Sequence, residues 1–190
     1  NKADVYDQED MERFEEMKAL YEGIGYPCLL TSVISHEGLE KLKSILKDKT
    51  TLMSGQSGVG KSTLVNALQP QLELRTGEIS DYSGKGQHTT TFAEMFPLSF
   101  GGYLIDTPGI KVLGFNYKDK TNIAHSFREF FKLSPQCRFG GACLHRSEPG
   151  CAVQAALEQG VVSELRYTHY LSLLDEVEEQ NYWDRKKVGI

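Results

Sequence analysis

The sequence predicts an α/β fold, in which a mostly parallel sheet with helices on both faces is followed by a small helical zinc-binding domain. Short apolar segments alternate with amphipathic ones over residues 8–68, a glycine-rich loop stands at residues 55–62, and three cysteines and a histidine gather within residues 137–151. Alternating strands and helices imply right-handed crossovers, and such sheets bind ligands at the carboxyl ends of their strands. A ligand site is therefore expected around the glycine-rich loop.

The spacing of apolar residues predicts the elements of the chain. In order, they are a helix over 8–22, a strand over 27–33, a helix over 35–47, a strand over 50–53, a helix over 61–68, and a hairpin of strands over 92–96 and 102–105. The alternation stops after about Tyr117, where a helix over 122–132, the Cys/His loop and further helices follow. We therefore expect two domains, residues 1–117 and 118–190.

Length and composition limit the classes of function. The 190 residues are enough for a nucleotide-binding core with a small appendage, and the formal net charge is −5. That balance argues against a protein that holds nucleic acid by bulk electrostatics, although local contacts with RNA stay open. No run of about 18 apolar residues is present, so we expect a soluble, cytoplasmic protein without membrane contact. Nothing in the sequence indicates an obligate dimer, and a monomer is expected.

The glycine-rich loop has the pattern of a phosphate-binding loop. Its glycines let successive backbone N–H groups point at a polyphosphate, Lys61 reaches the β and γ phosphates, and the Ser62 hydroxyl ligates Mg²⁺. A simple glycine turn before a helix is the alternative, but strand, loop and helix all fall where the motif needs them. The residues concerned are Gly55, Gln56, Ser57, Gly58, Val59, Gly60, Lys61 and Ser62.

Two later segments are expected to complete a triphosphate site. The tetrapeptide DTPG follows a predicted strand, where Asp106 can hold Mg²⁺ through water and the Gly109 N–H can contact the γ-phosphate. The polar segment 84–91 suits a loop that orders when triphosphate and metal bind. Thr90 or Thr91 is expected to complete the Mg²⁺ shell, and their spacing does not choose between them.

The first four residues, NKAD, predict guanine recognition. The Asp4 carboxylate would accept from N1–H and the exocyclic amine of guanine, a pairing that adenine does not offer, with Asn1 beside it and Lys2 along the ribose. The backbone N–H expected to bind guanine O6 lies among Thr31, Ser32 and Val33. In an ordinary GTPase this motif follows the phosphate-binding loop, so the order of motifs is permuted here.

The residue after DTPG bears on catalysis. Many GTPases carry a Gln there to orient the attacking water, but this chain has Ile110, whose side chain neither donates nor accepts. His88 is the predicted substitute, because a neutral imidazole can accept a hydrogen bond from water. A hydrogen-bonded loop histidine without a catalytic role is the alternative. Intrinsic hydrolysis is expected to be slow until a partner orders the loop.

Three thiols and one imidazole within fifteen residues form a set typical of a structural, tetrahedral zinc site. A disulfide with a spare thiol, or unligated core cysteines, are the alternatives. We expect one Zn²⁺ per chain, whose binding contributes to folding of the second domain. The predicted ligands are Cys137, Cys143, His145 and Cys151.

With these motifs on one chain, the sequence resembles the circularly permuted, ribosome small subunit-dependent GTPases of the YjeQ family. The resemblance covers nearly the whole chain and rests on NKAD preceding GQSGVGKST, on GQHTTT, on DTPGI and on Cys-x5-Cys-x-His-x5-Cys. It implies conversion of GTP to GDP and phosphate, binding to the 30S subunit and its 16S rRNA late in maturation, and stimulation by that subunit. It also implies that Thr63 contacts phosphate or metal, that His88 aids hydrolysis and that the Cys/His cluster holds zinc.

The same resemblance implies an N-terminal OB-fold and a strand before Asn1, neither of which is part of this chain. Two other functions stay open. One is a nucleotide-gated rRNA-binding module in which hydrolysis only times release. The other is a P-loop kinase with a structural zinc site, which the NKAD motif disfavours because a kinase would have no use for it.

Overall fold

The computed structural model describes residues 1–56, 58–72, 94–106 and 120–188. The chain divides into two compact units, one formed by Asn1–Met17 and Pro27–Gly114 and the other by Lys18–Tyr26 and Phe115–Ile190. The domain boundary predicted near residue 117 falls outside the described ranges and stays a prediction. Among the described helices, none is long and apolar enough to cross a membrane.

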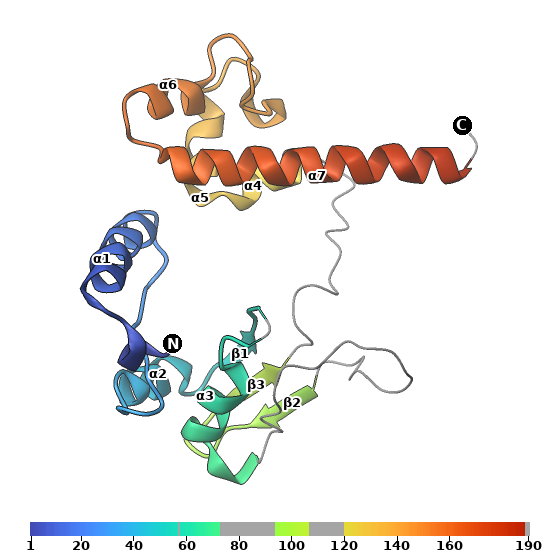
Figure 1. The fold of residues 1–190 in the computed structure, drawn as a ribbon. Helices are drawn as coiled ribbons and strands as arrows, with labels where there is room; N and C mark the ends of the chain where they lie inside the picture. Colours follow the sequence, from blue (N-terminus) through green and yellow to red (C-terminus); the bar gives the residue numbers. More distant parts are fainter. Residues whose placement is uncertain (57, 73–93, 107–119, 189–190) are drawn as a thin grey trace. The chain divides into compact units, whose positions relative to one another are not determined.

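The first unit is built on a three-stranded sheet in the order β1-β3-β2 (Figure 1). Strand β1 (Thr50–Met53) pairs in parallel with β3 (Tyr103–Asp106), and β2 (Glu94–Pro97) pairs antiparallel with β3, so the predicted hairpin is confirmed. The turn requires glycine at position 102, because its φ is +91° and an added Cβ would lie 2.4 Å from the Lys49 carbonyl oxygen. The parallel pairing brings the end of β1 beside the end of β3.

Helices α2 (Leu39–Leu46) and α3 (Lys61–Leu68) share one buried apolar core with the sheet. Val65 and Leu104 are its most buried members, each 1% exposed. The predicted helix over 61–68 and strand over 50–53 are confirmed to the residue. Since α3 begins directly after the glycine-rich loop, its packing on the sheet holds the loop at the carboxyl end of β1.

Three predicted elements of the chain differ from the structure. Residues 27–33 were expected to form a strand, but the segment pairs with no strand in the described residues, and its Thr31 carbonyl instead accepts from the Ala3 N–H at 3.1 Å. Helix α2 begins at Leu39 rather than at residue 35. Gly38 before it has φ +70°, and an added Cβ there would lie 2.1 Å from the Leu30 carbonyl oxygen, which requires glycine and a turn. The helix predicted over 122–132 is two helices, because Phe127 adopts an extended backbone.

The second unit consists of short helices and loops packed on one long helix (Figure 1). The helices are α4 (Lys120–Ser126), α5 (Arg128–Leu133), α6 (Ala152–Glu158) and α7 (Glu164–Val188), with 3-10 turns at Ser134–Gln136 and Gly140–Ala142. Their core contains Phe130, Tyr170 and Leu174, each fully buried, together with the three cysteines of the predicted zinc site. The ligand cluster and the apolar core of this unit are therefore one packed body.

Helix α1 (Gln8–Gly23) follows the 3-10 turn Ala3–Val5, and none of its residues is buried, although apolar residues recur along it at helical spacing. The residues at its end, Lys18–Tyr26, belong to the second unit. There Arg128 donates to the Gly25 carbonyl and lies over the Tyr26 ring, 4.7 Å from its centroid. The Arg166 guanidinium lies 5.4 Å from the Tyr21 ring centroid. Cation–π contacts thus hold this segment.

We expect Arg166→Ala to destabilise the second unit by about 2–4 kcal/mol, because it would leave the Glu129 carboxylate buried without a partner. Arg166 binds both Glu129 oxygens, at 2.7 and 3.3 Å, and the two side chains are only 12% and 9% exposed. Urea unfolding would measure the change. The matched control is Lys120→Ala, which breaks the more exposed Lys120–Glu178 pair, 39% and 35% exposed, and should cost less than about 1 kcal/mol. Equal costs for the two variants would contradict the prediction.

Candidate nucleotide site and metal site

The phosphate-binding loop leaves β1 and enters α3 through glycines in the left-handed region, Gly58 with φ +80° and Gly60 with φ +89°. The Lys61 ammonium donates to the carbonyls of Gly55 and Gln56, both at 2.8 Å. This places a cation inside the loop, where the backbone N–H groups that follow can face an anion. This geometry fits a polyphosphate. A simple glycine turn before a helix, the alternative considered above, does not account for a lysine side chain that folds back onto its own loop.

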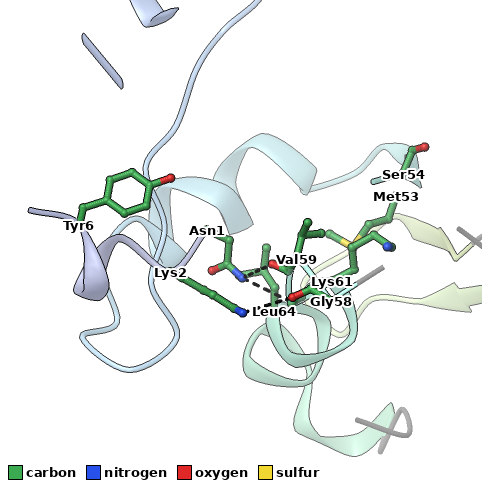
Figure 2. Close-up of a pocket in the computed structure, with 10 residues that line it drawn as sticks. Asn1, Lys2, Tyr6, Met53, Ser54, Gly58, Val59, Lys61 and Leu64 are labelled. Carbon is green, nitrogen blue, oxygen red and sulfur yellow. Dashed lines mark hydrogen bonds between the residues drawn. The ribbon is translucent and has the colours of Figure 1, made fainter. Parts of the chain in front are cut away.

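The first two residues of the chain contact the same loop (Figure 2). Asn1 Nδ2 donates to the carbonyls of Val59 and Gly60, at 3.2 and 3.4 Å, and Lys2 Nζ donates to the Gly58 carbonyl at 3.2 Å. Residues more than 55 positions apart in sequence therefore line one site. The permuted NKAD motif lies beside the phosphate-binding loop, as a single nucleotide bridging the two would need.

The predicted guanine-binding residues also contact one another. Thr31 Oγ1 donates to Asn1 Oδ1 at 3.3 Å, and the Ser32 hydroxyl donates to one oxygen of the Asp4 carboxylate. Ser32 is fully buried and accepts in turn from the N–H groups of Ile34 and Ser35. These contacts orient the Asp4 carboxylate.

A pocket of about 560 Å³ opens between the N-terminal motif and the loop, and its residues are drawn in Figure 2. This volume suits a nucleotide-sized ligand. The sequence had not indicated four of its lining residues, although Ser54 directly precedes the loop and Leu64 lies one turn after Lys61. Those four are Tyr6, Met53, Ser54 and Leu64.

Some predicted site residues are described only in part or lie outside the described part of the chain, and the role of every predicted site residue stays a prediction. Asp106 ends β3 beside Met53 of β1, which places its backbone at the predicted edge of the sheet, but its side chain is not described. Ser62 and Thr63 lie in the first turn of α3, and Val33 follows the buried Ser32. The residues outside the description are Ser57, His88, Thr90, Thr91 and Gly109.

We expect Gly60→Ala to destabilise the first unit more than Gly58→Ala. Both positions have positive φ, so alanine costs about 1–2 kcal/mol at either. A Cβ at Gly60 would also lie 2.6 Å from Asn1 Nδ2, whereas a Cβ at Gly58 meets nothing within 4 Å. The Asn1 side chain would swing away and lose its two hydrogen bonds, a further loss of about 1 kcal/mol. Thermal unfolding of both variants measures the difference, and identical midpoints would refute it.

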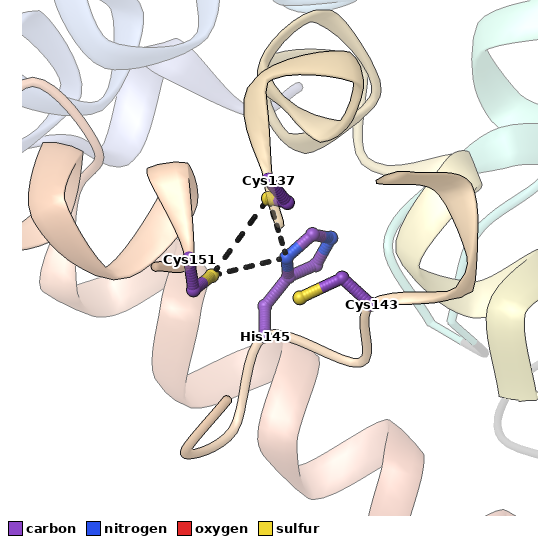
Figure 3. A group of neighbouring side chains, drawn as sticks. All are labelled: Cys137, Cys143, His145 and Cys151. Carbon is purple, nitrogen blue, oxygen red and sulfur yellow. Dashed lines mark hydrogen bonds between the residues drawn. The ribbon is translucent and has the colours of Figure 1, made fainter. Parts of the chain in front are cut away.

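The four predicted metal ligands converge in the second unit (Figure 3). Their ligand atoms all lie within 4.8 Å of one another, and all four residues are buried. His145 Nδ1 lies 3.3 Å from Cys151 Sγ and 3.7 Å from Cys137 Sγ, and these two sulfurs are 4.0 Å apart. Tetrahedral zinc with bonds of about 2.3 Å requires ligand atoms about 3.8 Å apart. The donor set and its spacing therefore fit Zn²⁺, with no position left for water.

Hydrogen bonds around the cluster orient its ligands. His145 Nε2 lies 3.3 Å from Ser134 Oγ, which itself donates to the Phe130 carbonyl, so the imidazole turns Nδ1 towards the sulfurs. Backbone N–H groups at the start of α6 donate to sulfur, Ala152 to Cys137 and Gln154 to Cys151. Such donors stabilise thiolates, because they place partial positive charge against sulfur.

The loop that carries His145 is held by three other side chains. The Glu148 carboxylate accepts from the N–H groups of Leu144, Arg146 and Ser147, at 2.8, 2.8 and 3.1 Å. Burial raises the pKa of Glu148, but these donors outweigh it and lower the pKa overall. Gln154 and Tyr167 both donate to the His145 carbonyl, at 2.8 and 2.7 Å. The sequence had not indicated these supporting residues, because they are polar residues of ordinary helices and turns.

Burial favours the neutral form of three of the ligands, Cys143, Cys151 and His145. It raises the pKa of the Cys143 thiol to about 12, raises the pKa of Cys151 and lowers the pKa of His145. A neutral imidazole binds a metal without losing a proton, whereas each thiol must release one. Metal binding should therefore release protons and weaken as the pH falls.

Comparisons with known proteins agree with this geometry. The family model described as RsgA GTPase matches residues 1–116. A curated relative from Bacteroides fragilis, "Small ribosomal subunit biogenesis GTPase RsgA", is 51% identical over 182 residues, and one of the same description from Porphyromonas gingivalis is 50% identical over 185. Each match covers 96% of this chain and 58% of the relative. The chain thus spans somewhat more than half the length of these relatives.

Two solved structures share the fold. YjeQ from Thermotoga maritima has a TM-score of 0.77 at 40% identity, and the match covers 93% of this chain and 57% of that one. YloQ, described as a circularly permuted GTPase, has a TM-score of 0.72 at 32% identity, over 94% of this chain and 55% of that one. The permuted α/β fold predicted from the order of motifs is confirmed, and the chain belongs to the RsgA GTPase family.

Proposed function

We propose that this protein hydrolyses GTP to GDP and phosphate during late maturation of the 30S ribosomal subunit and is stimulated by that subunit. One observation carries the nucleotide part of the proposal: Asn1 and Lys2 donate to the carbonyls of Gly58, Val59 and Gly60. A guanine motif and a phosphate-binding loop thus line one pocket. The ribosomal part is supported by the described function of the relatives. We further propose a cytoplasmic monomer that contacts 16S rRNA.

The residues of the pocket divide the work of binding. The carboxylate of Asp4, oriented by Ser32, would accept from guanine N1–H and its exocyclic amine. Lys61 would exchange its two carbonyl partners for the β and γ phosphates, because a phosphate oxygen carries more negative charge than a carbonyl. Mg²⁺, which would neutralise the triphosphate, is proposed to bind Ser62, Asp106 and either Thr90 or Thr91.

Water positioning is assigned to His88, because Ile110 follows the DTPG motif where many GTPases have Gln. The 30S subunit would order the loop that carries His88 and so accelerate a slow intrinsic reaction. The alternative is an rRNA-binding module in which hydrolysis only times release. A His88→Ala variant separates the two functions: in a timer it would bind 30S subunits and fail to leave.

GTP turnover measured with and without purified 30S subunits tests the proposal. We expect low turnover by the protein alone and a large increase with 30S subunits, while isolated 50S subunits should have no such effect. The full-length protein should be used, since this chain matches only part of each relative. An unchanged rate in the presence of 30S subunits would exclude the proposed coupling.

Guanine selection can be tested at Asp4. We expect Asp4→Ala to weaken GDP binding by at least tenfold and to remove most of the preference over ADP, because guanine would lose a charge-assisted pair of hydrogen bonds. Competition of GDP and ADP against a fluorescent nucleotide measures both effects. Glu9→Gln, which removes an exposed carboxylate of helix α1, is the matched control and should leave both affinities unchanged. If Asp4→Ala still prefers GDP over ADP, then Asp4 does not bind the guanine base.

A further inference from the structure

Aromatic and basic side chains lie next to one another on the surface of the second unit, beside the metal loop. We call His125, Phe131, Arg138, Phe139 and Gly141 the aromatic–basic patch. The rings of His125 and Phe131 meet edge to face, with centroids 5.5 Å apart. His125 Nε2 would lie 3.5 Å from a Cβ at Gly141, and the Arg138 guanidinium lies 5.8 Å from the Phe139 ring centroid. Gly141 lies in the turn that Phe139 precedes, so the His125–Phe131 pair and the Arg138–Phe139 pair lie on neighbouring segments.

The two phenylalanines of the patch are unusually exposed. Phe131 is 57% and Phe139 49% exposed, whereas Phe127 and Phe130, only a few residues away, are buried in the core. Leaving two large rings in water forgoes roughly 1–2 kcal/mol of burial each, and no residue in the described part of the chain covers them. Exposed aromatic residues beside a basic side chain indicate a binding surface.

The charge of Arg138 is not used within the described structure. Arg166 binds Glu129, Arg146 binds Asp175 and Arg128 donates to the Gly25 carbonyl. No carboxylate of the described residues forms an ion pair with Arg138, whose guanidinium lies over the Phe139 ring. The chain as a whole has a formal net charge of −5, so a cation without an acidic partner is a local feature. An arginine beside exposed phenylalanine rings favours a partner that has both negative charge and flat apolar faces.

Backbone contacts with the metal loop hold the patch rigid. The Arg138 N–H donates to the Gly150 carbonyl at 3.0 Å, and the Gly140 N–H donates to the Cys137 carbonyl at 2.9 Å. Phe139 therefore lies between two ligands of the metal site, Cys137 and Cys143. A ring presented by a rigid loop loses little conformational entropy on binding, which raises affinity.

We propose that the aromatic–basic patch binds unpaired RNA, with bases stacked on Phe131 and Phe139 and a phosphate held by Arg138. Single-stranded RNA offers splayed bases that stack on aromatic rings, whereas bases of a duplex are hidden from them. This inference rests on the proposed ribosomal function in its choice of RNA. It goes beyond that function by naming the residues and the state of the RNA that they recognise.

The test is binding of the full chain to a fluorescein-labelled, unstructured RNA of about 12 nucleotides, followed by anisotropy. Phe131→Ala and Phe139→Ala should each weaken binding by about 5- to 150-fold. Phe139→Leu should lose nearly as much, because leucine keeps apolar area but cannot stack. Arg138→Ala should lower the slope of log affinity against log salt by about 1. A duplex of the same length should bind no better than the alanine variants bind the single strand.

Matched controls come from the same unit. Val161 and Leu165 are 70% and 41% exposed and are not part of the patch, so Val161→Ala and Leu165→Ala should bind RNA as the unaltered chain does. Circular dichroism and one zinc ion per chain would show that each variant folds. Failure of the unaltered chain to bind the RNA, or equal affinity of the phenylalanine variants, would overturn the proposal. Full affinity in Phe139→Leu would assign the patch to a protein partner instead.

The same variants distinguish this inference from the proposed function. If the unaltered chain shows no GTPase activity but binds RNA, and the patch variants lose that binding, the proposed reaction is refuted and the patch stands. GTP turnover that rises with 30S subunits, together with unaltered RNA binding by every patch variant, would refute the patch alone.

Discussion

Removing zinc from the second unit is expected to lower its unfolding temperature by at least about 15 °C. Structural zinc contributes about 10–16 kcal/mol in small zinc domains, which equals or exceeds the whole stability of an ordinary domain. The loss should spread through the unit, because Cys137, Cys143 and Cys151 belong to the same buried cluster as Phe130 and Tyr170. Cys143→Ser, or treatment with a strong chelator, followed by thermal unfolding and metal analysis, measures this effect.

The chain offers a matched control for this experiment. Cys28 is a half-buried cysteine of the first unit, outside the ligand cluster, so Cys28→Ser should keep one zinc ion per chain and change the unfolding temperature little. Zinc affinity should also fall as the pH is lowered, since protons compete for the thiols. A metal-free chain two hydrogens lighter than the reduced form would show a disulfide and contradict the zinc site.

Lys61→Ala is expected to reduce the rate of GTP hydrolysis by a factor of about 100 to 1,000. Hydrogen-bond donors aimed at charge that develops in a transition state have effects of this size when removed. The Lys61 ammonium lies inside the loop, where it donates to the carbonyl oxygens of Gly55 and Gln56, both at 2.8 Å. Because the same ammonium would hold the phosphates of bound GTP, both kcat and nucleotide affinity should fall.

A lysine on the neighbouring helix supplies the control. Lys43→Ala removes the same charge from α2, where Lys43 pairs with the exposed Glu40, and should leave turnover unchanged. Steady-state rates with and without 30S subunits, together with GDP affinity, separate binding from catalysis. An unchanged kcat in Lys61→Ala would remove Lys61 from the catalytic site.

Local sequence predicted those elements whose conformation depends on near neighbours. The helix over 61–68 and the strand over 50–53 were correct to the residue, because a glycine loop separates a short apolar segment from an amphipathic one. Strands β2 and β3 of the hairpin each end one residue later than predicted, at Pro97 and Asp106.

Elements that depend on distant contacts were predicted less well. Residues 27–33 have the composition of a strand, but their backbone forms hydrogen bonds with segments that are not strands. The Thr31 carbonyl, for example, accepts from the Ala3 N–H. The start of α2 depends on the approach of Gly38 to the Leu30 carbonyl, and the break at Phe127 depends on packing of that ring in the core. The spacing of apolar residues along the chain predicts neither the backbone contacts between distant segments nor the packing of a particular ring.

The sequence by itself determined the kinds of site in this protein, because a phosphate-binding loop, a guanine motif and a Cys3His set each depend on residue type and short spacing. Only the tertiary structure decided that Asn1 and Lys2 reach the carbonyls of Gly58, Val59 and Gly60, and that Ser32 orients Asp4. It also decided that Phe131 and Phe139 lie exposed beside the metal loop. Such contacts join residues far apart in the chain, and their geometry follows from how the whole unit packs.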